Sequence, residues 1–112
     1  MVGHTGVRDA IIQAVEVLDH EVGRLLDVAI ELGYSALVTA DHGNCDEMVD
    51  IETGGPHTQH TQNPVPCMVA DKNVQFLSND GNLSAIAPTI LQLMGIPQPT
   101  TMTGKSLIQD VW

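Results

Sequence analysis

A long amphipathic segment followed at once by a short apolar run is the feature that most constrains this fold. Between positions 7 and 32, apolar residues recur at steps of three and four, the spacing of one helix face. They are Ile11, Val15, Leu18, Val22, Leu25, Leu26 and Ala29. Gly33 can end this helix, and the continuous apolar run 36–38 is typical of a strand covered on both faces in a parallel sheet. The order of these elements predicts an α/β fold.

The remainder of the chain continues the alternation of helix and strand. A polar segment at 45–64 predicts a long functional loop, and the sequence VPCMVAD at 65–71 predicts a second strand. Helical spacing resumes at 83–96, with Gly95 as a stop signal and Pro88 within the first turns. Two short strands cannot form a sheet covered on both faces, so part of a larger sheet is expected, with open edges that favour self-association.

Charge and hydropathy exclude two classes of partner. Fourteen acidic and four basic residues give a net charge of −10, which repels nucleic acid and anionic lipid surfaces. No window of about 18 apolar residues and no signal-peptide pattern occurs, so neither a membrane nor an export role is expected. The two cysteines lack metal-site spacing and suit reduced thiols. A cytoplasmic protein is the expectation.

Asp41 and His42 follow the first predicted strand in the sequence TADHGN. Ligands bind at the carboxyl ends of strands in α/β sheets, and a carboxylate beside an imidazole suits Mn²⁺ or Zn²⁺. Both could reach one ion only if the strand breaks here, which Gly43 permits. The alternative is a turn capped by Asp41, with His42 as an ordinary loop residue; the pair alone does not decide between them.

Further histidines lie in loops at the ends of the predicted elements. His57 and His60 are three residues apart in the polar loop, where both could bind one metal, one could bind while the other does not, or both could simply be exposed. His4 lies in a glycine-flanked segment, whereas His20 falls on the helix surface. Phosphate-binding loops of the Walker and GxGxxG types and the GxSxG nucleophile motif are absent from the 112 residues. The sequence therefore offers metal ligands but no evident nucleophile.

The motifs MVGHTG, TADHGN, HTQHTQNPVP and IAPTILQLMGIPQP, taken together, resemble the C-terminal segment of cofactor-independent phosphoglycerate mutases. These isomerases belong to the alkaline phosphatase superfamily and interconvert 2- and 3-phosphoglycerate in glycolysis, through a phosphoserine intermediate at a two-Mn²⁺ centre. The resemblance implies a partial three-layer sandwich of the alkaline phosphatase type, with an incomplete, mostly parallel sheet flanked by helices. It also implies that residues 1–112 form the C-terminal part of the metal-binding domain, without the nucleophile-bearing N-terminal part and the inserted phosphotransferase domain.

The resemblance also implies the metal ligands. His4 and His60 match the ligands of one ion, together with an aspartate that the family carries one position before Met1. Asp41 and His42 match ligands of the second ion, and His57 is a weaker candidate. The serine nucleophile has no counterpart here, so the chain by itself is expected to be inactive, to bind metal weakly, and to need the remaining part of the enzyme as its partner.

Two other functions remain open at the level of sequence. One is a different phosphomutase or a phosphatase of the same superfamily. The other is a free-standing, noncatalytic protein that binds a metal or a partner through the open sheet edge.

Overall fold

The computed structural model describes residues 2–47, 49–55 and 60–109, which form two α-helices and two strands. In chain order, the elements are a 3₁₀ turn at Val2–His4, helix α1 at Arg8–Glu31, strand β1 at Ala36–Thr39, strand β2 at Cys67–Ala70, a 3₁₀ turn at Leu83–Ala85 and helix α2 at Ile86–Leu93. Both helices end near glycines with positive φ, Gly33 at 80° and Gly95 at 66°. The α/β class is confirmed, as are both helices and both strands.

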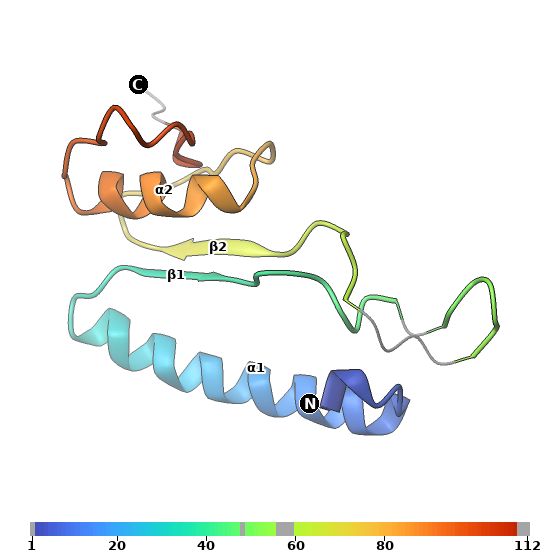
Figure 1. Cartoon of the computed structure of the whole chain (residues 1–112). Coiled ribbons are helices and arrows are strands. Elements are labelled where there is room, and N and C mark those ends of the chain that lie inside the picture. Colours follow the sequence, from blue (N-terminus) through green and yellow to red (C-terminus); the bar gives the residue numbers. More distant parts are fainter. Residues whose placement is uncertain (1, 48, 56–59, 110–112) are drawn as a thin grey trace.

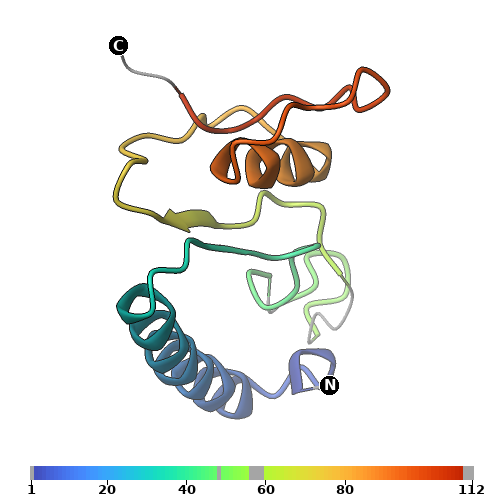
Figure 2. The same ribbon diagram turned by 90° about the vertical axis from the view of Figure 1, so that its left-hand side faces the viewer.

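The two helices lie on opposite sides of the strand pair, α1 on one side and α2 on the other, as both views show (Figures 1 and 2). The segment that joins β1 to β2 extends beyond the strands, and the N-terminal turn lies close to it. None of the described helices is long and apolar enough to cross a membrane. The N-terminal turn and the segment that joins β1 to β2 thus lie at the same end of the strand pair.

The strands pair antiparallel, which corrects the mostly parallel sheet that we expected. Ala36 faces Ala70 and Thr39 faces Cys67, in a two-stranded sheet. The apolar run in β1 reports partial burial but carries no information on strand direction, and the long return loop brings β2 back antiparallel. Each strand has one unpaired edge within the described residues. The pair is therefore an open fragment of a sheet.

The chain exposes more surface than a compact domain of its size. Its accessible area is 8684 Å², whereas a compact monomer of 12.0 kDa exposes about 6,000 Å². The radius of gyration is 16.9 Å, against about 13 Å expected for a compact domain of this length. Among the described residues, the buried apolar side chains are only Ile11, Ala85, Pro88 and Leu107. The core is too small to account for a stable independent domain.

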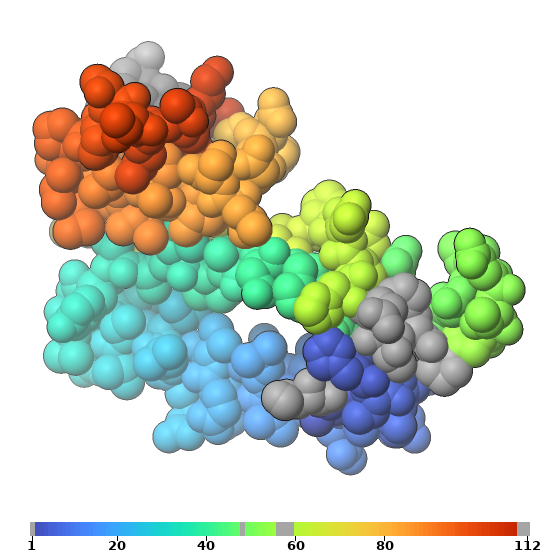
Figure 3. Space-filling model, in the orientation of Figure 1, coloured from blue at the N-terminus to red at the C-terminus, as the bar shows by residue number. Residues whose placement is uncertain are grey.

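The exposed surface is concentrated where helix α1 should be covered. Val15, Leu18 and Leu25 share a helical face with the buried Ile11, yet they are 51%, 61% and 70% exposed. The space-filling view shows an opening between the first half of α1 and the strand pair (Figure 3). The apolar face of α1 is thus available to further polypeptide.

The C-terminal segment is held against α2 by a buried threonine. Thr89 is fully buried, and its hydroxyl donates to the carbonyl of Ala85 at 2.6 Å and accepts from the amide of Leu107 at 2.9 Å. The carbonyl of Leu107 in turn accepts from the amide of Ser78 at 2.7 Å. Thr89 therefore joins three segments of the chain.

Replacing Thr89 with valine is expected to free the C-terminal segment. The change leaves the Leu107 amide and Ala85 carbonyl without their partner, at a cost of about 1–3 kcal/mol. The Ser78 amide should then exchange with solvent about 5- to 100-fold faster, measured by hydrogen exchange. Thr101→Val, at an exposed threonine, is the control; equal exchange in the two variants would contradict this role.

Candidate metal centre

Asp41 and His42 lie directly beyond the carboxyl end of β1, as their sequence position predicts. The Nδ1 atom of His42 lies 2.9 Å from the carbonyl oxygen of Gly43. When Nδ1–H donates to that carbonyl, Nε2 keeps its lone pair and faces the Asp41 Oδ1 atom at 3.6 Å. With Nε2 and Oδ1 at this separation, both atoms can lie about 2.1 Å from a single metal ion. The pair therefore fits a shared metal ion.

The ring of His42 forms a group with two further histidine rings, those of His4 and His60, from distant parts of the chain. The His42 and His60 rings stack with centroids 3.6 Å apart and planes inclined by 14°, and the His4 ring lies 5.1 Å from that of His60. The structure thus brings together His4, His42 and His60, with Asp41 next to His42. His57 lies outside the described residues, and His20 lies exposed in α1.

The stacking limits how these histidines can divide between ions. The lone pair of an imidazole nitrogen points outward in the plane of the ring. Because the rings of His42 and His60 are stacked and nearly parallel, their lone pairs lie in two separate, nearly parallel planes. They cannot converge on a single ion between them. Within the described residues, no three His, Cys, Asp or Glu side chains are arranged to hold one ion. The arrangement suits two ions, each needing ligands beyond these residues.

A carboxylate clamp holds together the segments that carry His42 and His60. The hydroxyl of Thr61 donates to both carboxylate oxygens of Asp46, at 2.9 and 3.0 Å, and the Asn63 Nδ2 atom donates to Asp46 at 2.8 Å. The Asn63 amide holds the pKa of Asp46 below its usual value; burial opposes this shift, and Thr61 reinforces it. Asp46 follows His42 along the chain, and Thr61 and Asn63 follow His60. We call these three residues the Asp46 clamp.

Gly43 is needed here for close approach rather than for chain flexibility. The amide of Thr61 donates to the carbonyl of Gly43 at 2.8 Å, and a Cβ atom at position 43 would lie 2.0 Å from the Thr61 hydroxyl. Gly43 is not among the glycines with positive φ, so the break that we expected it to permit is not its role. Any side chain at position 43 would push apart the segments that carry His42 and His60.

Sequence reasoning missed the clamp. Asp46 and Thr61 are 15 residues apart, with no periodic pattern to pair them. The available signal was the position of Thr61 and Asn63 directly after a candidate ligand, His60, and that of Asp46 in the turn after Asp41 and His42.

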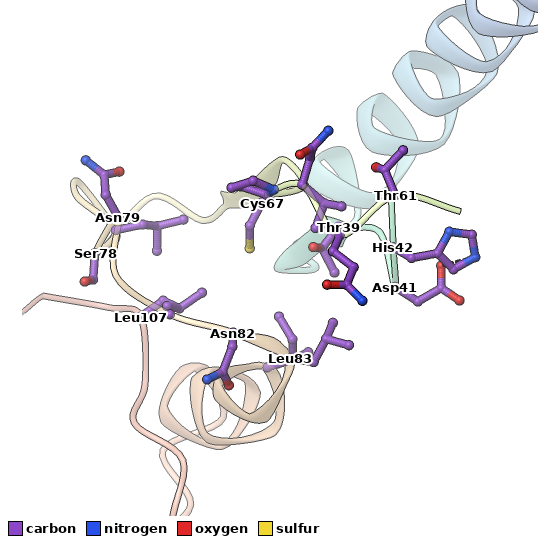
Figure 4. Close-up of a pocket in the computed structure, with 17 residues that line it drawn as sticks. Thr39, Asp41, His42, Thr61, Cys67, Ser78, Asn79, Asn82, Leu83 and Leu107 are labelled. Carbon is purple, nitrogen blue, oxygen red and sulfur yellow. Dashed lines mark ion pairs between the residues drawn. The ribbon is translucent and has the colours of Figure 1, made fainter. Parts of the chain in front are cut away.

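A cavity of about 590 Å³ opens next to Asp41 and His42. Thr39 and Cys67 from the strands bound one side of it, and Leu83 and Leu107 bound the other (Figure 4). Further polar lining comes from Asn63, Ser78, Asn79 and Asn82. A space of this size beside Asp41 and His42 is large enough for a small molecule or for a segment of another polypeptide.

Comparison with known proteins places these features in a family. A model of the metalloenzyme superfamily matches residues 1–98. The chain is 53% identical over 109 residues to 2,3-bisphosphoglycerate-independent phosphoglycerate mutase 2 of Methanosarcina barkeri, which covers 96% of this chain and 21% of that protein. It is 55% identical over 108 residues to the 2,3-bisphosphoglycerate-independent phosphoglycerate mutase of Rhodopseudomonas palustris, with the same two coverages.

A third relative, the 2,3-bisphosphoglycerate-independent phosphoglycerate mutase of Clostridium botulinum, is 51% identical over 109 residues and is covered over 21% of its length. The resemblance predicted from the sequence motifs is confirmed. The chain spans about a fifth of the length of these curated relatives and matches their C-terminal part.

Proposed function

Because the chain belongs to the metalloenzyme superfamily, we propose that it supplies one side of the two-ion centre of a cofactor-independent phosphoglycerate mutase. Such an enzyme is an isomerase that interconverts 2- and 3-phosphoglycerate in glycolysis, in the cytoplasm. The observation that carries the proposal is the meeting of His4, His42 and His60 from three distant segments, beside Asp41.

The proposed ligand roles divide between two ions. His4 and His60 hold one ion, and Asp41 and His42 hold the other; His57 is the weaker candidate. The stacking of His42 on His60 supports this division, since stacked rings cannot share an ion. Imidazole and carboxylate ligands suit Mn²⁺, and two such ions would stabilise the charge on a phosphoryl group during its transfer.

The chain's own residues position these groups. The Gly43–Thr61 bridge holds the His60 segment beside the turn after β1, and the Gly43 carbonyl orients the His42 ring. The nucleophile, assigned by resemblance to a serine, belongs to the remaining part of the enzyme. The basic residues here are Arg8, Arg24, Lys72 and Lys105, too few to bind a phosphate and a carboxylate together.

The proposed domain is the C-terminal part of a three-layer, alkaline-phosphatase-like sandwich. The open edges of β1 and β2 and the exposed face of α1 support it, because both need further strands and apolar side chains to cover them. The remaining part of the same enzyme is the proposed partner. Without it, these surfaces favour self-association of the chain.

A chimeric enzyme tests this function. In it, the present 112 residues replace the matching fifth of the Methanosarcina barkeri relative, and the product is called the chimera below. With Mn²⁺, we expect the chimera to interconvert 2- and 3-phosphoglycerate within about tenfold of the parent kcat/KM, because the ligand set is complete. The 112 residues alone should show no turnover. A folded but inactive chimera, or turnover by the chain alone, would refute the proposal.

A further inference from the structure

The Asp46 clamp joins two segments that each carry a proposed metal ligand, and its hydrogen bonds run between Asp46, Thr61 and Asn63 rather than to either ligand. One segment continues from Asp41 and His42 to Asp46, and the other continues from His60 to Asn63. A backbone hydrogen bond from the Thr61 amide to the Gly43 carbonyl also links these described segments. The carboxylate thus supplies most of the polar connections between the two segments.

The clamp has one buried member, Thr61, whereas Asp46 and Asn63 are exposed. Thr61 is 6% exposed, and its hydroxyl is shared between both oxygens of Asp46. The place where a side chain at Gly43 would begin is filled by this hydroxyl at 2.0 Å and by the Asp46 Oδ1 atom at 2.9 Å. A carboxylate accepts from two donors at once, which an amide or a hydroxyl does less well here.

We propose that Asp46 is a positioning residue: its carboxylate holds the His60 segment against the Asp41–His42 turn and so fixes the spacing between the ligands of the two ions. The inference rests on the proposed function for the ligand roles of Asp41, His42 and His60. Asp46 itself binds no ion. Its effect reaches the metal centre through Thr61 and Asn63.

Hydrogen exchange tests the clamp without metal. In the chimera, the Thr61 amide should exchange at least about tenfold faster in Asp46→Ala than in the unaltered protein, because the segment that carries it is released. Glu52→Gln removes a charge from the same loop without touching Thr61 or Asn63 and should leave the rate unchanged. An unprotected Thr61 amide in the unaltered chimera, or an unchanged rate in Asp46→Ala, overturns the inference.

Manganese binding tests the consequence for the site. Electron paramagnetic resonance of free Mn²⁺ measures the dissociation constant of the chimera for Mn²⁺. This constant should be about 10- to 100-fold higher in Asp46→Ala than in the unaltered chimera, the effect typical of a group that orients a ligand. Saturating Mn²⁺ should restore kcat, with KM for phosphoglycerate unchanged. A kcat that stays low at saturating Mn²⁺ indicates general structural damage and contradicts a positioning role.

An exchange of the side chains at Asp46 and Asn63, two of the three clamp residues, separates positioning from loss of fold. Asp46→Asn leaves two amides facing each other, and Asn63→Asp leaves two carboxylates, so each should weaken Mn²⁺ binding. The double variant Asp46→Asn/Asn63→Asp restores an amide–carboxylate pair, with the amide now at position 46 and the carboxylate at position 63. It should bind Mn²⁺ more tightly than either single variant. Additive losses would overturn the inference.

These results are distinguishable from failure of the proposed function. If His60→Ala loses Mn²⁺ while Asp46→Ala binds it as tightly as the unaltered chimera, the positioning role is wrong and the proposed function stands. If the unaltered chimera binds no Mn²⁺, the proposed function is wrong and the positioning role falls with it.

Discussion

Replacing His60 with alanine in the chimera is expected to lower kcat by more than about 100-fold. Groups that merely orient a metal ligand are worth about 10- to 100-fold, so loss of a ligand costs more. His60 is also the ring that stands between the other two histidines, 3.6 Å from His42 and 5.1 Å from His4. The rate of 2- to 3-phosphoglycerate conversion at a fixed Mn²⁺ concentration gives the result.

Two further histidines serve as controls for that measurement. His20→Ala removes an exposed imidazole from α1 and should leave kcat within about twofold, as surface substitutions usually do. His57→Ala should cost less than His60→Ala, since His57 is the weaker ligand candidate. If His57→Ala abolishes activity and His60→Ala does not, the assignment of these two residues is reversed.

Truncating Leu25 to alanine is expected to destabilise the chimera by about 2–5 kcal/mol, the cost of removing a buried leucine side chain. In the chain itself Leu25 is 70% exposed, although it shares a helical face with Ile11. Under the proposed function, the rest of the enzyme covers this face of α1 and buries Leu25 in the chimera. Urea-induced unfolding of the chimera and its variant measures the difference.

Ile30→Ala is the matched control, because Ile30 is 56% exposed and lies about 140° around α1 from Leu25. It should change the free energy of unfolding by less than about 0.5 kcal/mol. Equal effects of the two substitutions would contradict the claim that the face of α1 containing Leu25 packs against the rest of the enzyme.

The elements could be predicted from local pattern, but their pairing could not. The periodicity of 7–32 predicted α1 because helix spacing is set by the chain itself, and Gly33 and Gly95 marked the helix ends for the same reason. The antiparallel pairing of Ala36 with Ala70 depends on where a long loop returns, and three apolar residues carry no such information. Strand direction was therefore predicted wrongly.

The candidate site, like the fold, could be predicted from the sequence only in part. Asp41 and His42 could be placed at a strand end by sequence, and the resemblance selected His60 over His57. The Asp46 clamp could not be predicted, since it joins side chains across a loop whose path is fixed only by tertiary contacts. The same contacts explain Gly43, which sequence reasoning assigned to backbone freedom and the structure assigns to a lack of space.

The most direct test of the account is to locate Mn²⁺ in crystals of the chimera by anomalous diffraction at the manganese edge. We expect two peaks: one about 2.2 Å from ring nitrogens of His4 and His60, the other at the same distance from Asp41 and His42. A single peak shared by His42 and His60, or peaks that contact none of these four side chains, would contradict it.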